Sequence, residues 1–184
     1  MLALLFALQG ATDPGPTYSG RAKQLDVPIP RAEDVVRIDG VLDEPVWERA
    51  ARLTGFSLYR PVDGRPADDT ITVLVWYSSD AIYFGIRAYE AHGRVVRATL
   101  ADRDNIDTDD HVAILLDAYL DHRRATMFAV NPLGVQEDGV WSDGVAAGAA
   151  GGPSAGGRFD ATIDLNPDYV YESRGHVTDW GYEV

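Results

Sequence analysis

The sequence predicts an all-β protein: an antiparallel β-sandwich, jelly-roll-like, with one short helix near its N-terminus. Three observations lead to this prediction. Apolar residues alternate with a period of two along several short segments, and turn residues separate these segments. Only one segment carries apolar residues at helical spacing. Many short strands with regular turns are typical of a sandwich.

The first 34 residues precede the expected sandwich, which covers 35–184. Residues 1–11 form a short apolar run that ends in small residues, as in a signal peptide. A disordered apolar tag or a buried first strand would give the same pattern. Residues 12–34 are rich in Pro, Gly, Ser and Asp, so we expect a linker or extended arm there.

The one helical segment follows a turn at 39–40. We expect Asp43 to cap this helix and Pro45 to occupy its first turn, where no amide donor is needed. The apolar residues that share one helical face are Val46, Trp47, Ala50, Ala51 and Leu53. Such a stripe normally packs inward, so we interpret Trp47 as a core residue and not as a ligand platform.

The strands are expected from alternating or continuous apolar runs between turns. They cover 33–38, 70–77, 81–90, 111–117, 125–131, 135–141 and 159–163, and a further strand begins at 180. In 70–77 both faces are apolar, which suits a strand buried between two layers. Residues 144–157 are almost all Gly, Ala, Ser and Pro, the composition of a flexible loop.

Composition excludes several classes of function. The 184 residues hold 16 Lys and Arg against 29 Asp and Glu, a net charge of −13. Nucleic acids and anionic membrane surfaces both need a basic face, so neither is an expected partner. The chain has no Cys, which excludes disulfides and zinc-thiolate sites. No segment is long enough for a transmembrane helix.

The densest group of charges is an acidic loop with five carboxylates: Asp102, Asp104, Asp107, Asp109 and Asp110. Carboxylates this close repel one another unless a cation lies among them. Oxygen ligands alone suit Ca²⁺, so we expect a calcium site whose ligands are Asp102, Asp104, Asp107 and Asp110. The alternative is a solvated loop with Arg97 or Arg103 as counter-ion. The spacing does not match an EF-hand.

Three phrases belong together: IDGVLDEPVW at 38–47, RDNIDTDDHVAILLD at 103–117 and FAVNPLGVQ at 128–136. Their order and spacing resemble the family 9 carbohydrate-binding modules, which also occur at the N-terminus of bacterial envelope proteins. The resemblance spans 35–184 and implies a sandwich, with calcium bound structurally in related modules. In that family further strands follow the position of Val184. We therefore expect the sandwich to be incomplete at its C-terminus and the full-length protein to continue.

The family's sugar site is only partly matched. A clamp Trp of the family falls near Asp107, its Glu aligns with Ala113 and its Arg aligns with Ala129, whereas Asn131 does match. Sugar recognition needs aromatic rings and planar hydrogen-bonding groups. Trp141, Tyr119 or Trp180 would supply the ring in place of the family's clamp. We therefore expect a rearranged carbohydrate site that draws on Asn131, Trp141, Trp180 and Arg103.

The resemblance implies a carbohydrate-binding module that binds a glycan or oligosaccharide and is itself non-catalytic. It also implies an exported protein of the periplasm, outer membrane or extracellular space, linked by family to carbohydrate catabolism and O-glycosyl hydrolases. The alternative is a degenerate module that acts as a structural or protein-interaction domain of an outer-membrane-associated protein. A third hypothesis is an enzyme with paired catalytic carboxylates, since acidic residues abound.

Overall fold

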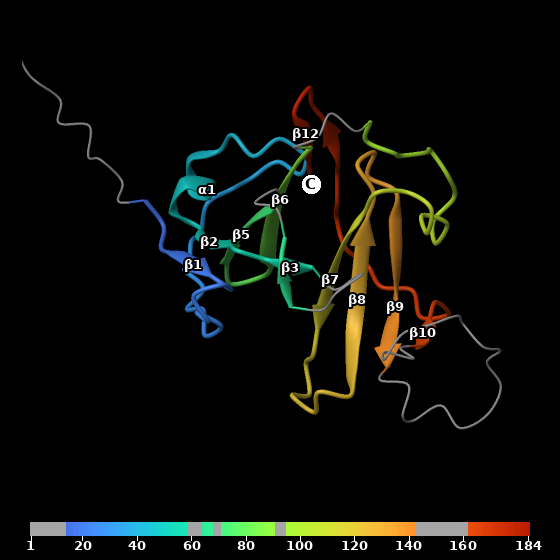
Figure 1. Cartoon of the computed structure of the whole chain (residues 1–184), viewed down its shortest axis with the longest axis horizontal. Coiled ribbons are helices and arrows are strands. Elements are labelled where there is room, and N and C mark those ends of the chain that lie inside the picture. The colour runs from blue at the N-terminus through green and yellow to red at the C-terminus, as the bar shows by residue number, and fades with distance from the viewer. Residues whose placement is uncertain (1–13, 59–63, 68–70, 91–94, 143–161) are drawn as a thin grey trace, which may run out of the picture. The chain divides into compact units, whose positions relative to one another are not determined.

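The computed structural model describes residues 14–58, 64–67, 71–90, 95–142 and 162–184 (Figure 1). The expected signal peptide at 1–11 and the expected loop at 144–157 lie outside these residues. The chain forms two compact units. The first comprises Met1–Val36 and Leu42–Ile86, and the second comprises Arg37–Val41 and Arg87–Val184.

The fold class is confirmed: the described residues form strands in mainly antiparallel, sandwich-like sheets with a single short helix. The first unit contains β1 (Thr17–Ser19), α1 (Pro45–Arg49), β2 (Ala51–Thr54), β3 (Ser57–Leu58), β4 (Arg65–Pro66) and β5 (Ile71–Tyr77). Strand β6 (Ile82–Tyr89) begins in the first unit and ends in the second. The second unit adds β7 (Val112–Leu116), β8 (Arg124–Val130), β9 (Gln136–Ser142), β10 (Thr162–Asp164), β11 (His176–Val177) and β12 (Gly181–Glu183).

The sheet of the first unit has the order β1-β2-β5-β6. Strand β2 pairs antiparallel with β5, with Ala51 opposite Val75, while β1 pairs parallel with β2. Strands β3 and β4 form a separate antiparallel pair. β1 lies within the segment expected to be a linker or extended arm, so part of that arm adds a strand to the sheet.

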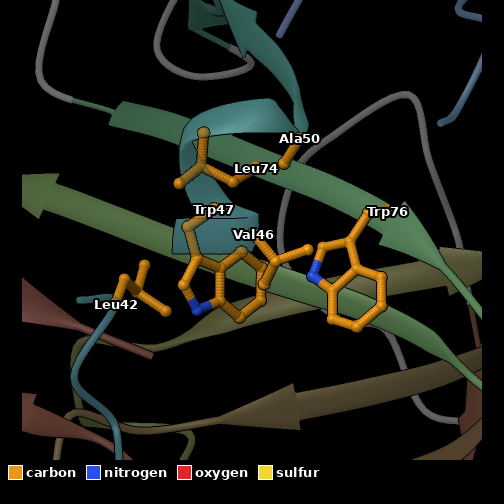
Figure 2. Packing of buried hydrophobic residues seen from close by; sticks show 6 residues of the cluster. All are labelled: Leu42, Val46, Trp47, Ala50, Leu74 and Trp76. Carbon is orange, nitrogen blue, oxygen red and sulfur yellow. The ribbon is translucent and has the colours of Figure 1, made fainter. Parts of the chain in front are cut away.

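The core of the first unit lies between α1 and the sheet. Figure 2 shows its buried side chains, which are Leu42, Val46, Trp47, Ala50, Leu74 and Trp76. The Trp76 ring stacks on Tyr83 with centroids 4.0 Å apart and meets Trp47 edge to face at 6.1 Å. Trp47 is 6% exposed. Its interpretation as a core residue is confirmed.

Two local predictions in this unit are wrong. The N-cap of α1 is Glu44 and not Asp43, and no side chain caps the backbone there. The Glu44 carboxylate instead accepts a hydrogen bond from Trp47 Nε1 at 2.9 Å. The apolar stripe is also broken, because α1 ends at Arg49 and Ala51–Thr54 is strand β2. Pairing with β1 and β5 satisfies the backbone groups of that segment.

The expected strand at 33–38 is not formed, and the chain next to β5 makes only an isolated bridge between Arg31 and Tyr77. The sequence also gave no signal for the short strands β1, β3, β4 and β11. Strands of two or three residues are too short for a periodic pattern, and their pairing depends on distant partners.

The second unit contains the antiparallel sheet β10-β9-β8-β7, in which β8 and β9 lie side by side over seven residue pairs (Figure 1). The C-terminal end of β6 pairs with β12, and β12 pairs with β11. The strands expected at 70–77, 81–90, 111–117, 125–131 and 135–141 are all confirmed to within two residues at their ends. The strand expected from 180 onward is β12.

Candidate functional site

The first predicted site residue, Arg103, lies in a dense polar network over β9. Its Nε donates to Asp138 Oδ1 at 2.9 Å, and its Nη1 donates to Gln136 Oε1 at 2.9 Å. Its Nη2 contacts the same Asp138 oxygen and donates to the Tyr169 carbonyl at 2.8 Å. The Asp138 side chain is 1% exposed. This charge-assisted network holds the segment around 169 against β9.

Aromatic contacts also hold this segment against the sheet. Phe128 of β8 meets Tyr171 edge to face at 5.1 Å, and the Arg103 guanidinium lies 5.6 Å from the Tyr171 ring centroid. The Tyr171 hydroxyl is within hydrogen-bond distance of the Ala129 and Glu137 carbonyls, at 2.9 and 3.2 Å. Burial raises the pKa of Tyr171 well above its usual range. The arrangement therefore keeps this phenol neutral and fixed.

Asn131, the residue that matches the resemblance, is fully buried just after β8. Its Nδ2 donates to the Thr99 carbonyl at 2.9 Å and to Asp109 Oδ2 at 2.8 Å. Its Oδ1 accepts from the Leu133 and Val135 amides at 3.0 and 2.9 Å. These four bonds use the hydrogen-bonding groups of the amide. Asn131 thus holds two loops together, and its contact with a sugar stays a prediction.

The carboxylates of the acidic loop that are hydrogen-bonded within the protein each have different partners. Asp109 is buried and accepts hydrogen bonds from Thr99 and Asn131, and these bonds, the Thr99 amide first, lower its pKa. Asp110 accepts from the Arg97 amide at 2.8 Å. Asp104 accepts from the Asp138 amide at 3.2 Å. Asp102 and Asp107 are exposed.

Within the residues that the structure describes, no group of three or more His, Asp or Glu side chains is placed to hold a metal ion. Calcium binding by Asp102, Asp104, Asp107 and Asp110 stays a prediction.

Trp141 lies near the end of β9, opposite Ala125 of β8 and Ile163 of β10. Its side chain is half-buried, and Ile163 is 46% exposed. It therefore forms part of an apolar sheet surface. No described aromatic ring pairs with it to form a wider platform.

Of the four predicted site residues, Trp180 has the surroundings best suited to stacking against a ligand. Its ring lies against Tyr89 of β6 with centroids 4.7 Å apart and planes tilted by 32°. Tyr89 is 41% exposed, and Trp180 is half-buried. Gly181 is opposite Tyr89, and a Cβ at Gly181 would lie 2.0 Å from the Ala88 carbonyl oxygen. Only glycine permits this close strand approach. We call Tyr89 and Trp180 the aromatic platform.

An ion pair lies on the same sheet face as Tyr89. Arg87 is two residues from Tyr89 on β6, and Glu183 of β12 is opposite Arg87. Arg87 Nε donates to Glu183 Oε1 at 2.7 Å, and the two side chains are 26% and 9% exposed. His176 of β11 is opposite Glu183 and exposed. No local pattern in the sequence predicts this grouping, because Arg87 and Glu183 are 96 residues apart.

Tyr182, between Gly181 and Glu183, points to the opposite face and is 8% exposed. Burial raises the pKa of Tyr182 to about 12. Its burial anchors β12 and leaves Glu183 on the same face as Arg87 and Tyr89.

No helix among the described residues has the length and apolar character needed to cross a membrane. Comparison with protein-family models, with curated protein sequences and with solved structures finds no match to this chain.

Proposed function

We propose that the chain is a non-catalytic carbohydrate-binding module and that its sugar site is the aromatic platform. The observation that carries the proposal is the partly exposed Tyr89–Trp180 ring pair beside the Arg87–Glu183 ion pair on one sheet face. Aromatic rings offer apolar faces to the C–H groups of a pyranose. Guanidinium and carboxylate groups are planar partners for its hydroxyls.

In this proposal Trp180 is the only one of the four sequence-predicted residues that contacts sugar directly. Arg103 and Asn131 stabilise the loops of the second unit. Trp141 lies on another sheet and serves as a matched control. An exported bacterial protein with this module would use it to attach to a glycan in the envelope or outside the cell, in agreement with the apolar run at 1–11.

Affinity electrophoresis in gels containing soluble xylan or hydroxyethylcellulose tests the site. The wild-type chain is expected to be retarded. Trp180→Ala should weaken binding roughly tenfold, the loss expected for one stacked ring, whereas Trp180→Phe should keep most of it. Trp141→Ala removes an equally large ring elsewhere and should change little. Equal losses for Trp141→Ala and Trp180→Ala would contradict the platform, and a wild-type chain that is not retarded by any glycan would contradict the function.

A second candidate function is a structural or protein-interaction domain. It is favoured by Arg103 and Asn131, whose side chains hydrogen-bond to protein groups at 2.8–3.0 Å. If this role is the main one, the chain binds no oligosaccharide while Arg103→Ala and Asn131→Ala lower its melting temperature. Retardation by a glycan with the Trp180 dependence given above would exclude it as the sole role.

A further inference from the structure

The outer strand β7 has an unusual composition for a sheet edge. It is the last strand in the order β10-β9-β8-β7, and among the described strands it pairs only with β8. Its five residues, VAILL, are all apolar. Natural sheet edges usually carry a Lys, a Pro, a β-bulge or an inward-pointing charged residue, each of which prevents pairing with a further strand. β7 has none of the protective side chains.

Side chains on both faces of β7 are accessible. Leu115 is 48% exposed, Leu116 is 36% exposed and Ala113 is also exposed. The other outer strands offer much less: β11 has two residues, and β1 and β10 have three each, with Asp164 ending β10. β7 is therefore the edge best suited to accept a further strand.

We propose that β7 pairs antiparallel with β7 of a second copy of this chain, with Ile114 on the two-fold axis. In this register Val112 lies opposite Leu116 and Ala113 lies opposite Leu115, so all five opposing positions are apolar. The flanking residues His111 and Asp117 of one copy then meet Asp117 and His111 of the other. A two-fold pairing makes each of these contacts twice.

The flanking pair selects this register. His111 is exposed, and its Nδ1 lies 3.0 Å from the Asp109 carbonyl oxygen. In the proposed dimer its Nε2 is the atom that meets Asp117 of the other copy. The Asp117 carboxylate is fixed by hydrogen bonds from the Tyr119 and His122 amides at 3.1 and 2.8 Å. A histidine ring nitrogen can donate a hydrogen bond to a carboxylate opposite it, and such a cross-strand pair stabilises the pairing. Moving the two-fold axis from Ile114 to Ala113 would instead place His111 opposite Leu115 and Asp110 opposite Leu116, and both His–Asp pairs would be lost.

A five-residue strand pair buries little area, so the dimer should be weak and dependent on concentration. Sedimentation equilibrium of the full chain is expected to show a mass rising from 20.1 kDa toward twice that value as concentration increases. Leu115→Lys should raise the dissociation constant roughly tenfold. In the dimer the new charge of each copy lies opposite Ala113 of the other copy, so the apolar contact is lost at both symmetric positions. Leu100→Lys, which adds the same charge at an 84% exposed position outside β7, should have no effect.

A mixing experiment tests the register itself. Ala113→Glu and Leu115→Lys should each weaken self-association, but their mixture should form a heterodimer because Glu at 113 then lies opposite Lys at 115. The control mixture of Val95→Glu and Leu100→Lys carries the same charges at exposed positions and should show no gain. Circular dichroism confirms that each variant is folded. A wild-type chain that stays monomeric at high concentration, Leu115→Lys equal to Leu100→Lys, or a mixture that does not associate would each overturn the proposal.

Discussion

At the scale of single residues, Asn131 joins the segment after β8 to the loop that carries Thr99 and Asp109. It makes four hydrogen bonds at 2.8–3.0 Å and is 0% exposed. Removing its amide leaves buried partners unsatisfied, so Asn131→Ala should lower the free energy of unfolding by about 2–4 kcal/mol. Urea unfolding measures this. Asn166→Ala, at an exposed position, is the control and should be nearly neutral.

Glu137 is a buried carboxylate with an unfavourable setting. It is 6% exposed, and its Oε2 has no hydrogen-bond partner among the described residues. Burial first, and then the charge of Asp107, raise its pKa. A raised carboxyl pKa means that stability present at low pH is lost as pH rises through the folded-state value.

The isosteric change Glu137→Gln removes this penalty. It should raise the free energy of unfolding at pH 7 by about 1 kcal/mol and have little effect near pH 4, where Glu137 itself is largely protonated. Thermal unfolding at the two pH values measures the difference. An equal effect at both pH values would mean that shape, and not charge, governs this position.

Residue roles were predictable from sequence only where the pattern was local. The apolar stripe around Trp47 predicted its burial correctly. The suitability of Trp180 over Trp141 depends on Tyr89, which is 91 positions away in the sequence, and on Gly181, whose lack of a Cβ permits a strand approach. The bonds of Asn131 and Arg103 likewise join distant segments. Such contacts leave no periodic signal in a single sequence.

At the scale of elements, the contact between α1 and β6 requires a glycine. A Cβ on Gly85 would lie 2.9 Å from both Leu42 Cδ1 and Trp47 Cζ3. Gly85→Ala should therefore overpack this core and lower the free energy of unfolding by about 1–3 kcal/mol. Urea unfolding measures it.

Gly64→Ala separates packing from backbone strain. Gly64 has φ of +74°, and nothing lies within 4 Å of its added Cβ. Its cost should be only the backbone penalty, about 1 kcal/mol. If Gly85→Ala costs no more than Gly64→Ala, the tight fit of α1 on the sheet is contradicted.

The longer strands were predictable because alternation over five to eight residues is a strong signal, as β5, β6 and β8 show. The helix was placed correctly at Pro45 but expected to run on, since Ala51 and Leu53 fit both periodicities. In the structure Ala51 pairs with Val75, and the segment that begins at Ala51 is a strand. Competition between helix and strand at such positions is settled by partners that a local pattern does not contain.

At the scale of the whole molecule, buried ionisable groups limit the pH range of stability at both ends. The lowered pKa of Asp109 contributes stability that is present above the unfolded-state value and is lost as pH falls through the folded-state value. The pKa of Tyr182, raised from 10.0 to about 12, contributes stability that is lost as pH rises across that interval.

Urea unfolding between pH 9 and pH 12 should therefore show a steady fall in the free energy of unfolding. Tyr182→Phe should reduce this fall in the free energy of unfolding. Part of the fall should remain, because the pKa of Tyr171 is also raised by burial. A fall of the same size in Tyr182→Phe would show that Tyr182 does not contribute.

The most direct test of the proposed function is a calorimetric titration of the folded chain with xylo- and cello-oligosaccharides, repeated with Trp180→Ala and after a separate titration with Ca²⁺. We expect heat of binding with at least one oligosaccharide in the wild-type chain and a strongly reduced signal in Trp180→Ala. No heat with any oligosaccharide, with or without Ca²⁺, would contradict sugar binding by the aromatic platform and leave a structural or interaction role.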